Sequence, residues 1–185
     1  MRISILYGAI REGRLSIRAA RALEAALHAT ARCEVLLHDL PEYDLPVMHA
    51  RLKDMPDPPQ LIVALGKALE EADGIVLLSP EYNNSYSGAL KNAVDYFTKE
   101  WAKKPIGITA CSSGKMGGVN ASNLMQLLVL GLGGYAMPRK WLVPDLAASL
   151  SEDGIPQNET VSRELQRFVE EMLWFTEAIA ARKKV

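Results

Sequence analysis

The chain has few of the features that mark an exported or membrane protein. Its two cysteines, Cys33 and Cys111, lie far apart, with no CxxC spacing and no histidine cluster nearby. Neither a disulfide framework nor a zinc site is expected, and a reduced cytoplasmic setting suits both thiols. The most apolar stretch, Leu124 to Met137, contains Gln126 and three glycines and is shorter than a membrane span of roughly 20 residues. We interpret this stretch as a buried helix and its turn.

An excess of charge of either sign is also lacking. The chain has 21 Lys and Arg against 22 Asp and Glu, a formal net charge of −1. Nothing in this balance favours a nucleic acid partner. The first residues lead directly into Ile3, Ile5 and Leu6, a run too short for the hydrophobic region of a signal peptide, so export is not expected. A length of 185 residues fits one domain, residues 1–185.

Short apolar runs alternate with longer amphipathic ones along the whole chain. This alternation is typical of βαβ units around a parallel sheet. Runs such as Ile75 to Leu78 lack polar alternation, as strands covered on both faces do. We therefore predict an α/β three-layer sandwich with a five-stranded parallel sheet and helices on both faces. The predicted strands are Ile3–Tyr7, Cys33–Leu37, Gly74–Ser79, Pro105–Ala110 and a fifth near Trp141–Val143.

Apolar residues at helical spacing predict the helices between these strands. The five sets are Ile17, Ala20, Leu23 and Leu27; Leu61, Leu65, Ala68 and Leu69; Ser87 or Gly88 to Phe97; Leu124, Leu127 and Leu128; and Val161, Leu165, Phe168, Val169, Met172, Leu173 and Ile179. Lys183 and Lys184 suit the negative end of the last helix dipole. The proline-rich segment from Pro41 to Pro59 is expected to be a long loop, near the site or against another subunit.

Three loops follow the carboxyl ends of predicted strands, where ligands bind in open parallel sheets. They are Gly8–Ser16, Pro80–Ser87 and Cys111–Gly118, each rich in small and hydrogen-bonding residues. Their convergence is what a flat ligand with polar edges requires.

The first loop enters a helix whose amino-terminal amides favour a bound phosphate. Gly8 and Gly13 have the glycine spacing of a P-loop, but Arg14 and Leu15 stand where that motif needs Lys and Ser or Thr, which argues against nucleotide hydrolysis. A G-x-G-x-x-G fingerprint is also absent, so a monophosphate fits better than a dinucleotide.

Two side chains of this loop can serve that phosphate. Ser16 can cap the helix and bond a phosphate oxygen, and Arg11 offers a planar fork of donors. The alternative is a surface loop with a helix cap and solvated arginines.

The second loop carries the most informative motif. Residues 80–95 read P-E-Y-N-N-S-Y-S-G-A-L-K-N-A-V-D. This run resembles the P-E-Y-N-x-S-x-P-G-x-L-K-N-A-x-D signature of the NADPH-dependent FMN reductases, which include azo, quinone and chromate reductases. Only Ser87 departs from it. The first loop resembles the family's G-S-x-R with Ala9 in place of serine, and Gly117 and Gly118 are similar to its glycine pair.

The resemblance implies a flavodoxin-like fold that binds FMN and uses NADPH or NADH as reductant. It places Gly8, Arg11, Ser16 and Ile17 at the phosphate; Pro80, Glu81, Tyr82 and Asn83 along the pyrimidine edge and N5 side of the ring; and Ser112, Ser113 and Gly114 against its other side. Hydride would pass from the nicotinamide through flavin N5 to a quinone, azo compound, free flavin or metal oxyanion. The flavin does the chemistry, so no catalytic side chain and no metal is expected. A homodimer or homotetramer is also implied.

Several residues have a structural interpretation beside the functional one. Tyr82 can be a half-buried packing residue, and Glu81 can cap or lie in solvent. Cys111 is expected to be an inert buried thiol, since no histidine nearby would activate it. The histidines, His38 among them, are assigned no role. Arg14 or Arg18 could meet a nucleotide 2′-phosphate.

The helix that follows the second loop also has its own alternative. At their spacing, Lys91, Asn92 and Asp95 are expected to tie the helix to a loop rather than touch the cofactor. The alternative function is a flavodoxin-type FMN electron carrier that oxidises no nicotinamide itself, although such carriers are usually strongly acidic. A weaker alternative is a flavin-free sensory or scaffolding domain.

Overall fold

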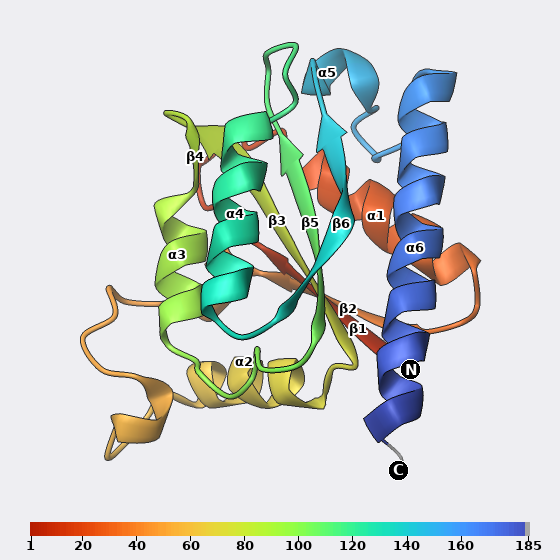
Figure 1. Ribbon diagram of the computed structural model, residues 1–185. Coiled ribbons are helices and arrows are strands. Elements are labelled where there is room, and N and C mark those ends of the chain that lie inside the picture. Colours follow the sequence, from red (N-terminus) through yellow and green to blue (C-terminus); the bar gives the residue numbers. More distant parts are fainter. Residues whose placement is uncertain (184–185) are drawn as a thin grey trace.

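Five parallel strands form one sheet in the order β2–β1–β3–β5–β6 in the computed structural model, which describes residues 1–183 (Figure 1). The strands are β1 (Arg2–Tyr7), β2 (Glu34–Asp39), β3 (Gly74–Tyr82), β5 (Pro105–Cys111) and β6 (Tyr135–Val143). The predicted five-stranded parallel sheet is confirmed. A sixth strand, β4 (Ser85–Tyr86), pairs antiparallel with the end of β3 and was missed because a two-residue strand leaves no pattern.

The edge strand β6 is longer than the sequence indicated. Tyr135 to Met137 belong to this strand and not to the turn of a helix, so that part of the interpretation was wrong. Pro138 and a shift in register between Ile106 and Ile108 of β5 interrupt the regular pattern here. The extra residues lie in β6, between Ala136 and Lys140. Both features suit an edge strand, because bulges are commonest at sheet edges and proline is tolerated there.

Helices cover both faces of the sheet, as predicted (Figure 1). One face packs against α1 (Ile17–Ala29) and α6 (Glu159–Lys183), the other against α2 (Gln60–Glu71), α3 (Gly88–Asp95) and α4 (Val119–Gly131). One short helical turn, α5 (Leu146–Ser149), follows β6. Among residues 1–183 no helix has the length and apolarity to cross a bilayer. Lys184 and the side chain of Lys183 lie outside the described residues.

The inner face of α4 is not the predicted one. Leu124 and Leu127 are 41% and 65% exposed, and Leu130 is 59% exposed. The buried side chains are Ala121, Ser122, Met125 and Val129. Both faces of this helix carry apolar residues, so spacing alone could not tell inside from outside. Leu61 of α2, which is 50% exposed, was misplaced in the same way.

Ser87 joins the end of β1 to the start of α3. Its hydroxyl donates to the carbonyl of Gly8 and accepts the amide of Leu90 at 3.0 Å, and its own amide donates to Ser79 Oγ at 2.9 Å. Proline, which the resembling motif has here, would supply neither the hydroxyl nor the amide. The serine therefore makes its own cap for α3. Gly8 is required beside it, because a Cβ there would lie 2.5 Å from Leu90 Cβ.

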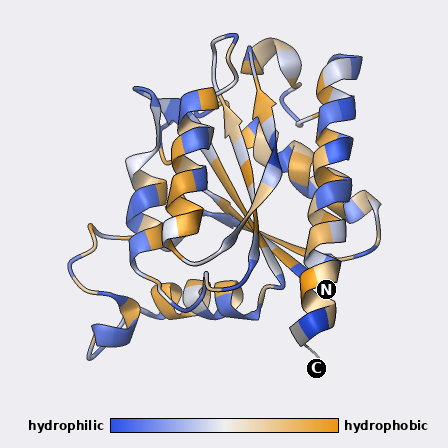
Figure 2. Ribbon diagram, viewed as in Figure 1, coloured by the Kyte–Doolittle hydropathy of each residue, from blue (hydrophilic) through white to orange (hydrophobic). Residues whose placement is uncertain are grey.

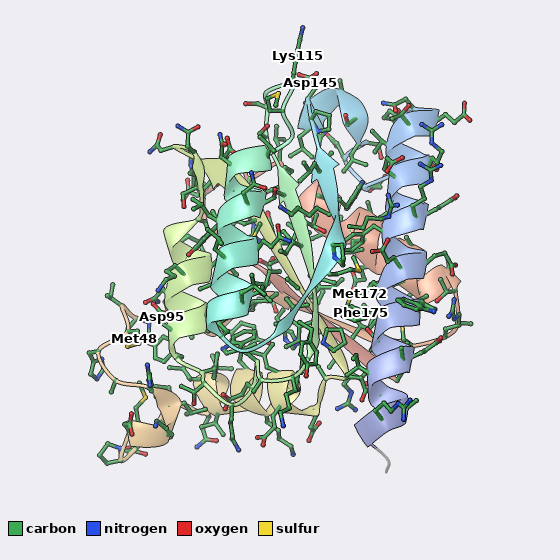
Figure 3. The ribbon with its side chains drawn as sticks, viewed as in Figure 1. Met48, Asp95, Lys115, Asp145, Met172 and Phe175 are labelled. Atoms are coloured by element: carbon green, nitrogen blue, oxygen red, sulfur yellow. The ribbon has the colours of Figure 1, made fainter. Side chains whose placement is uncertain are left out.

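The long segment after β2 is tied to α3. The Asn92 side chain donates to Pro46 O at 2.7 Å and accepts the Met48 amide at 2.8 Å. Lys91 pairs with Asp95 one turn along the helix. The expectation that these side chains tie the helix to a loop is confirmed for Asn92, whereas Lys91 and Asp95 pair within α3. Met48 and Asp95 lie on the same side of the molecule (Figure 3).

A neutral histidine links β1, β2 and the turn after β2. His38 is buried, its Nδ1 lies 2.7 Å from the hydroxyl of Tyr43, and its Nε2 lies 3.1 Å from Ser4 Oγ. Burial lowers the pKa of His38 to about 4. The charged form is therefore disfavoured in the folded protein.

Acid should destabilise the fold through His38. Between pH 6.5, the ordinary pKa of histidine, and about pH 4, His38 is protonated in the unfolded chain but neutral in the folded one. The free energy of unfolding therefore decreases by up to about 3 kcal/mol as the pH is lowered through this range. Urea unfolding at several pH values gives the free energy of unfolding as a function of pH. The slope of this free energy against pH should be flatter over this range for His38→Gln than for the wild type. The exposed His28→Gln should keep the wild-type slope. Equal slopes for wild type and His38→Gln would contradict this assignment.

Candidate functional site

A cavity of about 550 Å³ opens at the carboxyl edge of the sheet. Four segments line it: the loop after β1, the end of β3, the end of β5 and the α5 turn after β6. The lining residues are Arg11, Glu12, Gly13, Arg14, Leu15, Ser16, Pro80, Glu81, Tyr82, Cys111, Ser112, Ser113, Asp145, Leu146, Ala147 and Ala148. The three loops predicted to converge therefore do so, and a fourth joins them.

The loop after β1 presents a run of free backbone amides. The Gly8 amide donates to Leu78 O at 2.8 Å and the Arg18 amide to Leu15 O at 3.0 Å. Between them, from Ala9 to Ile17, no amide makes a well-formed hydrogen bond to any described residue. Residues 11–16 of this run line the cavity. Unbonded amides at the start of a helix favour an anion, because the positive end of the helix dipole lies there.

The two predicted side chains of this loop both line the cavity, with partners that the sequence did not reveal. Ser16 is at the amino-terminal cap position of α1, yet its side chain makes no capping bond. Its Oγ instead lies 2.6 Å from the hydroxyl of Tyr7. The guanidinium of Arg11 lies over the ring of Tyr82, with its Cζ 5.2 Å from the ring centre. Arg11 thus connects the first loop to the second across the cavity.

Four of the predicted residues do not line the cavity. Gly8 is buried beneath Leu90, and the side chain of Ile17 contacts the core. Asn83 is exposed, in the turn between β3 and β4 with a φ of 49°. The carbonyl of Gly114 accepts the Asp145 amide at 3.1 Å, so this glycine fixes the wall of the cavity from behind.

The end of β3 contributes Pro80, Glu81 and Tyr82. Glu81 Oε2 accepts the amide of Ala121 at 3.0 Å and so caps α4, the structural role that the sequence left open. Pro80 has no amide hydrogen, and amide donors at this edge can therefore come only from the residues after it.

The end of β5 supplies a tight, small-residue wall. Burial raises the pKa of the Cys111 thiol to about 12, which keeps it protonated and inert as expected. Ser112 and Ser113 follow it into the cavity. Gly118 then starts α4 at a φ of +86°, where a Cβ would lie 2.8 Å from that of Ala110.

The α5 turn was missed by sequence reasoning. Its position depends on the Leu146 amide, which donates to Ser112 O at 3.1 Å. Figure 3 shows Asp145 at the carboxyl edge of the sheet, beside the loop that bears Lys115. The signal was available, because the loop after the fifth parallel strand must also leave from this edge.

Other basic side chains near the cavity are already bonded within the protein. Arg14 donates to Asp39 at 2.8 and 2.5 Å, and also to Ala9 O. Arg18 donates to Leu150 O at 3.0 Å and lies near Glu152. The suggestion that Arg14 or Arg18 meets a 2′-phosphate thus has no support in their contacts.

Comparison with known proteins gives the same picture. The family model for the NADPH-dependent FMN reductases matches residues 1–148. The chain is 33% identical over 139 residues to an NADPH azoreductase of a Bacillus strain, covering 72% of this chain and 76% of the relative. It is 30% identical over 176 residues to a quinone reductase of Pseudomonas putida, covering 91% and 90%.

Solved structures agree with these relatives. A flavoenzyme NAD(P)H:(acceptor) oxidoreductase from Paracoccus denitrificans superposes with a TM-score of 0.82 at 26% identity, covering 96% of this chain and 97% of that one. The flavodoxin-like fold is therefore confirmed. So is the prediction of an oxidoreductase from a family whose cofactor is FMN and whose reductant is NADPH. The chain belongs to the NADPH-dependent FMN reductase family.

Proposed function

We propose that this chain is an NAD(P)H-dependent reductase that holds FMN in the cavity at the carboxyl edge of the sheet and serves a small acceptor. A quinone, an azo compound, free flavin and a metal oxyanion are the candidate acceptors. The observation that carries the proposal is the meeting of a loop of free amides with the Pro80–Tyr82 edge in one cavity. A volume of about 550 Å³ is within the roughly 300–1,000 Å³ of cofactor sites.

The donor set at one end fits a phosphate. No amide between Ala9 and Ile17 makes a well-formed hydrogen bond within residues 1–183, and Ser16 adds a hydroxyl. Arg11, which makes no ion pair with a described carboxylate, adds a charge and a planar fork of donors. The fully buried Ala9 stands where the family motif has a serine. One hydroxyl donor is therefore lost, and the backbone amides carry more of the phosphate binding.

The other end fits a flat ring. Tyr82 and Pro80 offer apolar surface on one side, while Ser112 and Ser113 allow close approach of backbone on the other. Asn83 and Gly114 do not line the cavity, but they shape these two walls. Asn83 lies in the turn between β3 and β4, and the carbonyl of Gly114 accepts the amide of Asp145. Gly8, packed against Leu90, and Ile17, packed against the core, support the phosphate end of the cavity without lining it.

Bound FMN would supply the redox chemistry, taking a hydride from NAD(P)H and giving two electrons to the acceptor. The residues that line the cavity bind and orient the flavin. Glu81 is held as the cap of α4, and Cys111 stays protonated, so neither is placed as a general acid or a nucleophile. Arg11 and Ser113 are exposed, which leaves the cavity accessible to nicotinamide and acceptor in turn.

Anaerobic mixing with NADPH should distinguish this reductase from a flavodoxin-type carrier. The purified protein should be yellow, and heat should release FMN from it. NADPH or NADH should bleach the bound flavin quickly in stopped flow, because the cavity admits the nicotinamide directly. A flavin that stays oxidised would favour the carrier, and a colourless protein that binds no FMN would contradict both.

Arg11→Ala should weaken FMN binding by about tenfold to a hundredfold, since a charged hydrogen bond contributes roughly 1.5–3 kcal/mol. Titration of apo-protein with FMN measures the effect. Arg32→Ala is the matched control, because Arg32 pairs with Glu170 and Glu177 on α6 instead of lining the cavity. Unchanged affinity in Arg11→Ala would show that the phosphate does not lie at this loop.

We also propose that the protein works as a homo-oligomer, in the cytoplasm, which suits its two free thiols. The interface is argued from α4, which has apolar residues along its length (Figure 2). Leu124, Leu127 and Leu130 on its outer face are exposed and form an apolar stripe. No ionisable residue lies between Val119 and Gly131, so no charged partner is selected. A second copy matches such a surface by symmetry.

The apolar stripe of α4 is too small to form a stable interface without neighbouring apolar residues. A 13-residue helix is about 20 Å long, which is too little alone for the ~800 Å² per partner of a typical complex. Met116, 68% exposed, and Tyr135, 42% exposed, extend the apolar surface beyond the two ends of α4.

Leu127→Glu should convert the oligomer to monomers, because it would bury an unpaired carboxylate in the interface. Light scattering after size-exclusion chromatography measures the mass. Leu61→Glu, at the 50%-exposed leucine of α2, should leave the mass unchanged. A wild-type protein that is monomeric at micromolar concentration would refute the interface.

A further inference from the structure

A buried tyrosine lies directly beneath the serine at the cavity. Tyr7 is the last residue of β1, paired in register with Asp39 of β2 and Leu78 of β3. It is fully buried, and its hydroxyl lies 2.6 Å from Ser16 Oγ. Ser16 is 4% exposed and lines the cavity. Sequence reasoning assigned Tyr7 no role beyond its strand.

The tyrosine ring is held in place from the side. The Cζ of Arg14 lies 5.1 Å from the centre of the Tyr7 ring, and Arg14 is fixed in turn by its two hydrogen bonds to Asp39. Burial raises the pKa of Tyr7, so its hydroxyl keeps a proton at neutral pH. A rigid, protonated phenol is therefore presented to Ser16.

The two hydroxyls share one hydrogen bond, and its direction matters. Within residues 1–183, Ser16 is the only hydrogen-bond partner of the Tyr7 hydroxyl. When Tyr7 donates, Ser16 Oγ is satisfied as an acceptor and its own proton is free to point elsewhere. An anion in the cavity favours this direction, and each bond in such a chain strengthens the next.

We propose that Tyr7 is a positioning residue that directs the Ser16 hydroxyl toward the phosphate of FMN and so helps the site prefer FMN to riboflavin. This inference rests on the proposed function. Tyr7 itself touches no ligand, because it is buried behind Ser16 and does not line the cavity. Its effect is transmitted through one hydroxyl.

Titration of apo-protein with FMN and with riboflavin tests the role. Tyr7→Phe keeps the ring and its contact with Arg14 and removes only the hydroxyl. FMN affinity should fall by about three- to tenfold, the size of one hydrogen bond, while riboflavin affinity stays unchanged. Tyr96→Phe is the matched control. It removes another buried phenol, which donates to Pro46 O at 2.8 Å, and should alter neither affinity.

The Ser16→Ala background separates positioning from a structural effect. There, Tyr7→Phe should cause no further loss of FMN affinity, because the two residues act through the same bond. An equal loss for both ligands, or a full loss in the Ser16→Ala background, would overturn the role of Tyr7 and leave the proposed function standing. A wild-type protein that binds FMN no better than riboflavin would overturn both.

Discussion

The geometry of the site depends on the close contact between the end of β1 and the start of α3. Gly8 approaches Leu90 so closely that no side chain fits between them, and the Ser87 hydroxyl closes the contact through the Gly8 carbonyl. This contact fixes where the first loop leaves the sheet relative to the second. Because the amide-rich loop and the Pro80–Tyr82 edge belong to different βα units, nothing local could set their separation.

Two residues of the family motif are replaced in this chain. Serine replaces proline at position 87 and takes over the capping of α3. Alanine replaces serine at position 9 and is buried, so Ser16 is the one hydroxyl residue of the Gly8–Ser16 loop. The sequence showed both substitutions, but only the structure shows that Ser87 caps α3 with its own hydroxyl and that Ala9 is fully buried.

Fold and cavity walls could be predicted because they follow from local patterns. Unbroken apolar runs gave the central strands, and the rule that loops gather at the carboxyl edge gave three of the four walls. The sequence could not show which face of α4 is buried, since both faces are apolar. Nor could it show that Ser16 bonds Tyr7 instead of capping the helix. These facts depend on contacts between segments distant in the chain.

The distribution of charge explains why one arginine matters at this cavity. Of the two arginines in its lining, Arg14 pairs with Asp39 and lies over Tyr7. The Arg11 guanidinium lies over the ring of Tyr82 and makes no hydrogen bond or ion pair within residues 1–183. A guanidinium on an aromatic face has lost little of its capacity for hydrogen bonds, since that contact uses no N–H group. The donors of Arg14 are therefore used within the protein, on Asp39 and Ala9, while those of Arg11 are left for the phosphate that we propose at this loop.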